Sequence, residues 1–535
     1  MLLLLQCLGS LLLLLLVAGI AIRLAYPLPA LEPRSVSRHL GDTADTPLGR
    51  GAAALMEGHV GLTGIHMLND GREAFAARIL LAQRATRSLD IQYYIWHGDL
   101  SGTLLLEAVR QAADRGVRVR MLLDDNGITG LDTTLAALDR HPHIEIRLFN
   151  PFVLRKPKML GYLADFPRLN RRMHNKSFTA DDQATIIGGR NVGDEYFGAR
   201  QQGLFVDLDV LAIGPIVNAV SSDFDRYWTS QSAYPADRIL PPVSERELVR
   251  FAEQASIVEH NPAAHDYISA IQSLPFIEQV VSGSLPLAWA HVRVVSDDPA
   301  KGVGKAGREA LLGPALERII GRPGKEVRLI SGYFVPTRAG VERFAALSGQ
   351  GRDVAIFTNA FEATDVWIVH AGYAERRKAL LRSGVRLFEL RRSEGEGAPS
   401  NGRKFISTGS GSGSGSGDEG PVLRSSNATL HAKTFAIDRE KLFVGSFNFD
   451  PRSIHLNTEL GFVIESPELA ATISDVFAHQ IPFTAYEVVL TEDDDLNWIE
   501  RGPDGEKRHE LEPGTSRLQR IGIWVLSHLP IEWML

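Results

Sequence analysis

Hydrophobic and polar positions follow one order in the first part of the chain. Residues 88–96 form an apolar run rich in isoleucine and aromatic residues, and residues 103–115 repeat leucine, alanine and valine at helical spacing. Residues 116–123 and 144–149 are again strand-like. The patterns predict a strand, a helix and two further strands.

The second part of the chain repeats that order. Residues 326–335 match the first strand, residues 341–347 the helix, and residues 353–358 and 385–390 the two later strands. A repeat of about 250 residues is too long for a solenoid and indicates a duplication. We therefore expect two tandem α/β domains, with duplicated mixed β-sheets flanked by helices.

Composition shifts divide the chain further. The expected segments are an apolar N-terminal segment, a linker, a first domain, a connecting segment, a second domain and a C-terminal extension (residues 1–23, 24–65, 66–245, 246–290, 291–485 and 486–535). The second domain contains a Gly-Ser run at residues 407–420, which predicts a flexible surface loop.

The first 22 residues are almost wholly apolar. About 20 such residues span a bilayer core. A signal peptide would normally carry positive charge before its apolar stretch, and here only the terminal amine is positive. We expect an uncleaved membrane anchor, with a removed signal peptide as the alternative.

The overall composition is that of a globular protein that does not coat polyanions. The net charge of −7 argues against nucleic acid as a partner. The single cysteine, Cys7, excludes an intramolecular disulfide framework and a cysteine-based zinc site.

One motif occurs twice, as His-x-Lys-x-Phe-x-x-Asp followed after six residues by Gly-Gly or Gly-Ser and then x-Asn. The first copy supplies His174, Lys176, Asp181 and Asn191, and the second supplies His431, Lys433, Asp438 and Asn448. A lone copy of His-x-Lys-x4-Asp should occur by chance in roughly one chain in twenty of this length. Two copies that share Phe, Gly and Asn at identical offsets make chance negligible.

The residue types of the motif suit phosphoryl transfer. Residues two apart on a strand share a face, so each His and Lys point the same way. Two ammonium groups stabilise a more negative transition state, and the two Asn can donate hydrogen bonds to non-bridging oxygens. One neutral imidazole can attack phosphorus while the other, protonated, serves the leaving alcohol. This chemistry needs no metal or cofactor, and we expect one active site at the domain interface.

The duplicated motif resembles the HKD signature of the phospholipase D superfamily, at every defining position in both copies. Residues 332–336, 363–366, 370–373 and 529–533 are similar to the bacterial cardiolipin synthase C type within that superfamily. The resemblance runs from about residue 70 to the C-terminus and implies two phospholipase D-like domains.

The resemblance also implies roles. An acidic residue downstream of each motif orients the histidine, while the motif Asp is more structural. In the repeat, Glu459 aligns with Asp207, with Asp209 as the rival to Asp207; ordinary strand-end carboxylates are the alternative for both. The N-terminal histidine, His174, would be the nucleophile, and His431 the general acid and base.

Three features favour a lipid substrate. The chain begins with a membrane-length segment, and residues 518–535 form an apolar, Trp-bearing stretch that either lies in a membrane interface or packs on the protein. Six cationic residues among apolar ones suit an anionic bilayer surface: Arg155, Lys156, Lys158, Arg168, Arg171 and Arg172.

The first functional hypothesis is a membrane phosphatidyltransferase, anchored in the bacterial inner membrane. It would transfer a phosphatidyl group to phosphatidylglycerol through a phosphohistidine and make cardiolipin, with phosphatidylethanolamine as a candidate donor. A phospholipase D or nuclease that uses water is the alternative, and an inactive lipid-binding scaffold is the third.

Three further clusters stay open at this stage. Residues 124–126 close a strand and either form a turn or line the cleft, where they could bind a cation. His97 and Asp99 sit at a strand end with the same ambiguity. His370 and Tyr373 either shape a lipid pocket or pack in the core.

Overall fold

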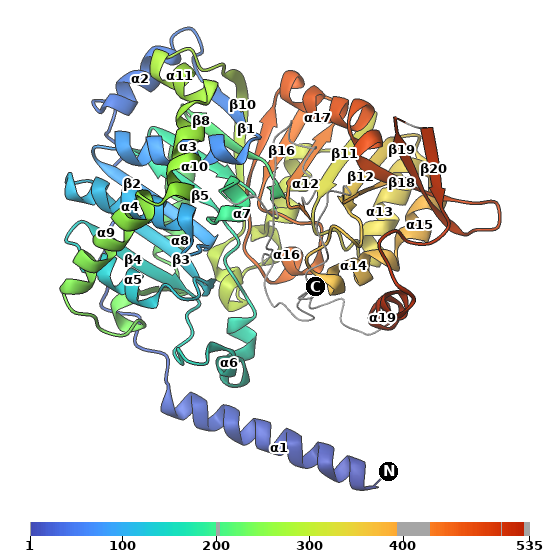
Figure 1. The fold of residues 1–535 in the computed structure, drawn as a ribbon, viewed down its shortest axis with the longest axis horizontal. Coiled ribbons are helices and arrows are strands. Elements are labelled where there is room, and N and C mark those ends of the chain that lie inside the picture. The colour runs from blue at the N-terminus through green and yellow to red at the C-terminus, as the bar shows by residue number, and fades with distance from the viewer. Residues whose placement is uncertain (1, 200–203, 393–428, 504, 529–535) are drawn as a thin grey trace.

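The two sequence blocks fold into two α/β lobes that lie side by side (Figure 1). The computed structural model describes residues 2–199, 204–392, 429–503 and 505–528. Within these residues, 18 strands form one continuous hydrogen-bonded sheet that runs through both lobes.

The first lobe is built on a mixed sheet. Its strands are β1 (Thr63–Leu68), β2 (Ser88–Ile95), β3 (Arg118–Gly127), β4 (Ile144–Phe149), β5 (Ser177–Ala180), β6 (Ala184–Gly188), β8 (Asp209–Ile213) and β9 (Ala233–Pro235). Their spatial order is β1-β8-β6-β5-β2-β3-β4-β9. The neighbours β2, β3 and β4 are parallel, and the other pairs are antiparallel.

The second lobe repeats this order. Its strands are β10 (Ala288–Ser296), β11 (Glu326–Ser331), β12 (Asp353–Asn359), β13 (Arg386–Leu390), β15 (Lys433–Ile437), β16 (Lys441–Gly445), β17 (Leu460–Glu465), β18 (Ala485–Leu490), β19 (Leu496–Gly502) and β20 (Gly505–His509). The order is β10-β17-β16-β15-β11-β12-β13-β18-β19-β20, with β11, β12 and β13 parallel. The first eight strands match the first lobe one for one, which confirms the duplicated mixed sheet.

Helices cover the sheets. In the first half they are α2 (Pro47–Leu55), α3 (Gly71–Arg84), α4 (Leu100–Asp114), α5 (Asp132–Leu138), α6 (Gly161–Leu169), α7 (Asp194–Phe197), α8 (Ile216–Trp228), α9 (Arg246–Glu259), α10 (Pro262–Gln272) and α11 (Pro275–Ser282). In the second half they are α12 (Leu312–Ile320), α13 (Arg338–Gly349), α14 (Trp367–Ala374), α15 (Arg377–Arg382), α16 (Pro451–His455), α17 (Pro467–His479), α18 (Ile481–Thr484) and α19 (Arg517–Ser527).

The predicted elements are found, with shifted ends. Residues 144–149 form β4, and the helix expected at residues 103–115 begins at Leu100, because the Asp99 side chain caps it by accepting from the amide of Gly102. The strand expected to reach residue 335 ends at Ser331. At Gly332 the chain passes so close to the Leu430 carbonyl that a Cβ would lie 2.2 Å from its oxygen, so only glycine fits just after the strand.

The lobes are joined by backbone pairing and by a shared core. Strand β1 pairs antiparallel with β10, and two short strands, β7 (Phe205–Val206) and β14 (Thr429–Leu430), pair in parallel. A buried cluster contains residues of both lobes, among them Val210 of β8 and Phe462 of β17. Because this interface is apolar and continuous with both sheets, groups placed at it are held rigidly.

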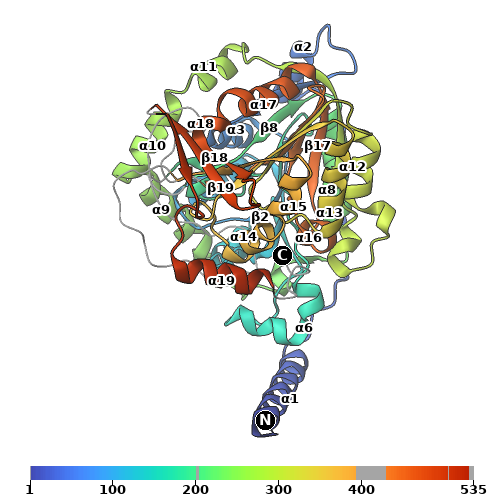
Figure 2. The ribbon, with the colours of Figure 1, turned by 90° about the vertical axis from the view of Figure 1, so that its right-hand side faces the viewer.

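The N-terminal segment forms α1 (Leu2–Ala25), which extends away from the lobes below α6 (Figures 1 and 2). It touches α6 where Gly19 approaches the Leu163 carbonyl. Across the part of the chain that the structure describes, no helix is long and apolar enough to cross a membrane. The Gly-Ser run at residues 407–420 and the family-like stretch at 529–533 lie outside the described residues.

The segments between and beyond the expected domains carry secondary structure. The expected linker contains α2 and ends in β1, and residues 246–290 contain α9, α10 and α11 and the start of β10. The expected C-terminal extension begins inside β18, which pairs with β13 in the second sheet. The predicted domain boundaries stay predictions.

Candidate active site

The two motif histidines lie at the junction of the lobes, just before strands β5 and β15. Both side chains are fully buried. The backbone amide of His174 donates to the Thr458 carbonyl (2.8 Å), and that of His431 donates to the Val206 carbonyl (2.8 Å). Each histidine is therefore tied to the backbone of the other lobe, which explains why the strands begin only after it.

This pairing brings the two predicted acids to the histidines crosswise. The residue after Thr458 is Glu459, whose Oε2 lies 2.9 Å from His174 Nδ1. The residue after Val206 is Asp207, whose Oδ2 lies 2.6 Å from His431 Nδ1. Each carboxylate thus contacts the histidine of the opposite lobe. Asp207, whose carboxyl has a lowered pKa, accepts and does not donate, and His174 Nδ1 also lies 3.1 Å from the carbonyl oxygen of Ser446, so on both rings Nδ1 carries the hydrogen and Nε2 keeps its lone pair.

Asp209 is placed elsewhere. Its Oδ2 lies 2.8 Å from the guanidinium of Arg78, and its Oδ1 accepts from the Arg190 amide (3.1 Å). Of the two rivals named from the sequence, Asp207 is the one that contacts a motif histidine.

The two motif lysines are buried beside the histidines. Lys176 Nζ donates to the His174 carbonyl (2.6 Å), and Lys433 Nζ lies 2.8 Å from His431 Nδ1. Burial lowers the pKa of Lys176 well below its ordinary value and that of Lys433 to about 8. Two ammonium groups that lose hydration in this way gain from an anionic ligand, so the site favours a phosphate.

A tyrosine faces each histidine and lysine. The Tyr94 ring meets the His174 ring edge-on at 5.1 Å between centroids, and Lys176 Nζ lies 5.5 Å from that ring. The Tyr333 ring meets the His431 ring edge-on at 6.0 Å, with Lys433 Nζ at 6.0 Å. These aromatic walls were not predicted from the motifs, although both tyrosines lie at the end of the first parallel strand of their lobe.

The motif aspartates lie at the far end of the motif strands, where they bind backbone. Asp181 and Asp438 both adopt left-handed conformations, with φ of 51° and 56°, in the turns after β5 and β15. Asp181 accepts from the amides of residues 86–88, and Asp438 accepts from those of residues 324–326. Each carboxylate fixes the start of β2 or β11 against its motif strand.

The motif asparagines differ from each other. The Asn191 side chain accepts from the Ile95 amide (3.2 Å) and donates to the Tyr196 hydroxyl (3.0 Å), and the Tyr196 ring lies edge-on to His431 at 5.4 Å. Asn191 therefore supports the wall around His431. Asn448 is buried, and its Oδ1 has no hydrogen-bond partner among the described residues.

The two histidine–carboxylate pairs differ in charge. Burial opposes ionisation of Asp207, but Lys433 and His431 hold the pKa of that carboxyl well below its usual value. Burial raises the pKa of Glu459 to about 7 against the opposing effect of Lys176. Burial and the neighbouring lysines together lower the pKa of both histidines, that of His431 to about 3. With no anion bound, both imidazoles are neutral at pH 7.

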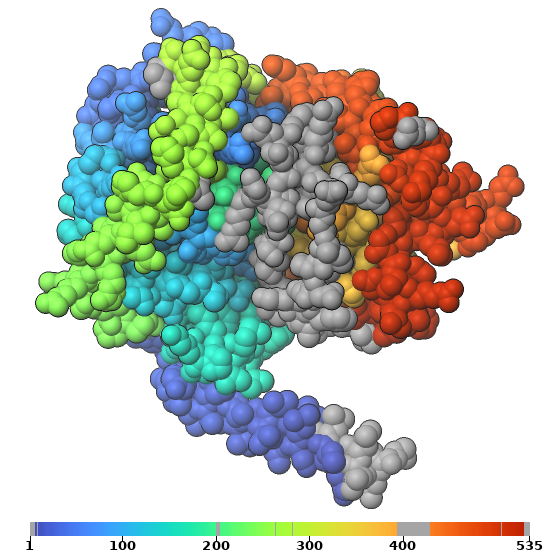
Figure 3. Space-filling model, viewed as in Figure 1, coloured from blue at the N-terminus to red at the C-terminus, as the bar shows by residue number. Residues whose placement is uncertain are grey.

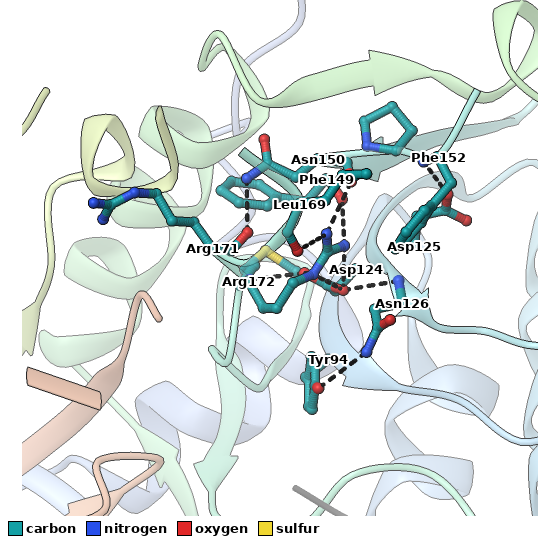
Figure 4. A network of polar contacts seen from close by, with 12 residues as sticks. Tyr94, Asp124, Asp125, Asn126, Phe149, Asn150, Phe152, Leu169, Arg171 and Arg172 are labelled. Atoms are coloured by element: carbon teal, nitrogen blue, oxygen red, sulfur yellow. Dashed lines mark hydrogen bonds and ion pairs between the residues drawn. The ribbon is translucent and has the colours of Figure 1, made fainter. Parts of the chain in front are cut away.

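A buried ion pair holds the segment that leads into His174 (Figure 4). The Arg172 guanidinium donates to Asp124 at the end of β3, and the Met173 amide donates to the same carboxylate (2.8 Å). Both charged side chains are fully buried. Asn126 donates to the Tyr94 hydroxyl (3.4 Å), so this end of β3 supports both the backbone and the wall of the site.

The basic stretch before His174 is engaged within the protein. Five of its six cations form ion pairs or hydrogen bonds with protein groups: Arg155, Lys158, Arg168, Arg171 and Arg172. Lys156 is exposed. The acidic residues at 124, 125, 132 and 165 neutralise four of these cations internally, and the expectation that the stretch suits an anionic bilayer surface stays a prediction.

One group of three described residues could offer ligands to a metal ion. Ligand atoms of His97, Asp99 and Glu195 lie within 4.8 Å of one another. His97 Nδ1 lies 3.0 Å from Glu195 Oε1, and Asp99 caps α4 and accepts from the Asp194 amide (2.8 Å). These contacts assign the three residues to pairing and capping.

The remaining family-like residues are part of a buried network in the second lobe. His370 Nε2 lies 2.6 Å from Glu512 Oε1, and the Tyr373 hydroxyl donates to Glu389 (3.0 Å). Both residues are buried and act as packing and pairing groups in this structure.

Two α/β lobes of matching strand order, each bringing a His-Lys pair to one buried centre, define a protein of the phospholipase D superfamily. The family described as "Cardiolipin synthase, PLD-like domain" matches residues 79–228 and 316–481, one segment in each lobe. The chain belongs to this family.

Similar proteins support the same assignment. The chain is 48% identical over 477 residues to cardiolipin synthase C of Escherichia coli (strain K12), which covers 89% of this chain and 97% of that protein. It is 25% identical to a cardiolipin synthase of Staphylococcus aureus (strain Mu50), over 77% of this chain and 66% of that protein. A crystal structure of phosphatidylserine synthase from Haemophilus influenzae Rd KW20 matches the fold, with a TM-score of 0.54, 13% identity and coverage of 91% and 100%.

Proposed function

We propose that this protein is a membrane phosphatidyltransferase that transfers a phosphatidyl group to the free hydroxyl of phosphatidylglycerol and so makes cardiolipin. The observation that carries the proposal is the pair of crosswise histidine–carboxylate contacts, flanked by two buried lysines. The similarity to proteins named cardiolipin synthase supports the substrate class.

In the first step, His174 Nε2 attacks the phosphorus of the donor lipid. The N–P bond forms, the P–O bond to the donor head group breaks, and His431 as imidazolium gives its Nε2 proton to the departing oxygen. In the second step, neutral His431 takes the proton from the incoming hydroxyl, whose oxygen attacks phosphorus. The N–P bond breaks and releases neutral His174.

The different charges of the two couples support this division of roles. The ionised Asp207 stabilises positive charge on His431, which suits a group that must gain and lose a proton. Glu459 is part-protonated near pH 7 and stabilises an imidazolium at His174 less well, which suits a neutral nucleophile. A bound phosphodiester anion would raise the pKa of the buried His431 and load it with the needed proton.

A bilayer as the working surface is supported by apolar side chains on one side of the molecule. Helices α1, α6 and α19 lie on the same side in two perpendicular views (Figures 1 and 2), and α6 and α19 are at the surface there (Figure 3). Their exposed apolar residues include Leu11–Leu16 of α1, Met159, Leu160, Leu163 and Phe166 at α6, and Leu518, Ile521, Trp524 and Val525 of α19.

Within the described residues, the C-terminal stretch packs on the protein with one face and exposes the other. Ile523 of α19 is buried in a cluster with Phe361 and Ala371, so one face packs on the second lobe. The opposite face is open, with Trp524 63% exposed. We propose that this face and α1 enter the bilayer interface of the bacterial inner membrane, with α1 as the anchor.

The full-length protein in vesicles tests the transfer. Labelled phosphatidylglycerol is supplied alone and with phosphatidylethanolamine, and products are separated by mass spectrometry. Cardiolipin is the expected product, and a higher yield with phosphatidylethanolamine would make that lipid a donor. Phosphatidic acid as the sole product would replace transfer by hydrolysis, and cleavage of added DNA without lipid turnover would remove the lipid assignment.

A further inference from the structure

The two lobes differ where their duplication predicts likeness. Each histidine faces a tyrosine, but the tyrosine hydroxyls have chemically different partners. In the first lobe, the amide of Asn126 donates to Tyr94 (3.4 Å). In the second lobe, the hydroxyl of Tyr333 donates to the carboxylate of Asp365 (2.6 Å). Asn126 lies near the end of β3, and Asp365 lies in the loop that follows β12, so both come from the C-terminal side of the second parallel strand of their lobe.

Asp365 has an oxygen that nothing in the described protein satisfies. Its Oδ2 accepts from Tyr333, while its Oδ1 is buried and has no hydrogen-bond partner among the described residues. Buried carboxylate oxygens nearly always accept a hydrogen bond, so an orphaned one calls for a donor from outside the chain. The donor has to be a hydroxyl or an amine, because a carboxylate offers only lone pairs.

The neighbourhood of Asp365 is the acid–base side of the centre. Tyr333 contacts both Asp365 and the His431 ring, whose Nε2 is also buried without a partner in the described chain. Two unsatisfied acceptors, one imidazole nitrogen and one carboxylate oxygen, are thus joined by a single tyrosine. A ligand that brings two O–H donors can offer one to each acceptor.

The difference in charge between Asp365 and Asn126 suggests which substrate binds in which lobe. A carboxylate repels a phosphate and attracts neutral hydroxyls, whereas the amide at the equivalent place in the first lobe carries no charge. The first lobe, with His174, suits the phosphate of the donor, and the second suits an alcohol. The free glycerol head of a phospholipid carries a hydroxyl next to the one that reacts.

We propose that Asp365 and Tyr333 form the acceptor-alcohol site, in which Asp365 Oδ1 binds the second hydroxyl of a vicinal diol while the first reaches His431 Nε2. This inference rests on the proposed transfer function and specifies its acceptor. Asp365 is then a specificity residue, because it binds the second hydroxyl of the acceptor and contacts neither the donor lipid nor the phosphorus.

Competing soluble alcohols test the proposal. The full-length protein is given phosphatidylethanolamine vesicles with equal concentrations of 1-propanol, 1,2-propanediol and 1,3-propanediol, and the phosphatidyl alcohols are counted by mass spectrometry. The wild type is expected to favour 1,2-propanediol over 1-propanol by about tenfold, as one buried charged hydrogen bond allows. Asp365→Asn should bring that ratio close to one.

Matched variants keep the test decisive. Tyr333→Phe frees Asp365 to turn and should lower the ratio by about threefold to fivefold. Tyr373→Phe removes the same kind of hydroxyl–carboxylate contact, from Tyr373 to Glu389 in the same lobe, and should keep the wild-type ratio. Because the readout is a ratio within one reaction, partial loss of folded protein in a variant does not alter it.

The possible outcomes separate this inference from the transfer function itself. Phosphatidic acid alone, with no phosphatidyl alcohol from the wild type, would overturn the transferase. Transfer without a preference for the vicinal diol, or a preference that survives in Asp365→Asn, would overturn the acceptor site and leave the transferase standing.

Discussion

Replacing Glu459 with Gln should stabilise the protein at alkaline pH. Glu459 is fully buried, and burial raises its pKa from 4.5 to about 7. Between these pH values the unfolded chain gives up the proton while the native state keeps it, so the free energy of unfolding falls as pH rises. Above pH 7 the native carboxyl ionises as well, and the free energy of unfolding falls no further.

The size of the effect follows from the pKa difference. At about 1.4 kcal/mol per pKa unit, the native state loses about 1 kcal/mol by pH 5.5 and about 3 kcal/mol by pH 8.5. A glutamine keeps an acceptor for His174 Nδ1 and never ionises. The free energy of unfolding of the Glu459→Gln variant should therefore exceed that of the wild type by about 3 kcal/mol at pH 8.5 and by about 1 kcal/mol at pH 5.5.

Thermal unfolding at a series of pH values measures this difference. For a chain of this size that unfolds as one unit, 3 kcal/mol corresponds to about 3 °C in Tm. The matched control is Asp207→Asn at the equivalent place of the other couple. There the native pKa is lowered, so the native carboxylate adds stability above its unfolded pKa, and the variant should melt below the wild type at pH 8.5. Equal Tm values for Glu459→Gln and wild type at pH 8.5, or a gain that does not depend on pH, would refute the reasoning.

Three further outcomes are expected. His174→Ala and His431→Ala should each abolish transfer, and rapid alkaline quenching of the wild type with labelled lipid should leave the label on His174; label on His431 would exchange their roles. Asp181→Ala should lower stability by about 3 kcal/mol, since it strands three backbone donors, and an unchanged Tm would contradict this. Trp524→Glu should weaken sedimentation with anionic vesicles by about tenfold, whereas Val60→Glu, at an exposed site beyond α2, should not; equal binding would remove α19 from the membrane surface.

Local sequence patterns predicted the lobes well because their elements are made by local forces. The apolar run of β2 and the helical spacing of α4 could be recognised because β2 is buried along its whole length and α4 buries one face in its own lobe. The motif predicted a His and a Lys side by side, and the Lys176 and Lys433 ammonium groups do lie at the carbonyls of their own histidines.

The crosswise pairing lay beyond the reach of pattern reading. It depends on which carbonyl each histidine amide finds, and His174 finds that of Thr458 across 284 positions of the chain. Alignment of the repeats pointed to Asp207 and Glu459 as acids but contained no information on which histidine each would serve.

The internal partners of the cationic stretch before His174 could not be predicted for a related reason. Its charges looked solvated because their acidic partners are distant in sequence or hidden in other patterns. Asp124 and Asp125, read as a turn or a cation site, are the counter-charges of Arg172 and of Arg155 with Lys158. The fold neutralises that stretch from within and leaves its apolar residues to the surface.

The exchanged carboxylates have an evolutionary consequence. In a two-fold symmetric dimer, every contact between the two copies occurs twice, in opposite directions. The two lobes show such a reciprocal contact, because each places a carboxylate against the histidine of the other. Fusion of two gene copies would have kept these contacts while allowing the two lobes to diverge. The different side chains at Asp207 and Glu459, and at Asn126 and Asp365, would be results of that divergence. A single lobe expressed by itself would have a motif histidine without its carboxylate partner. Mixing the two separately expressed lobes would restore both histidine–carboxylate contacts.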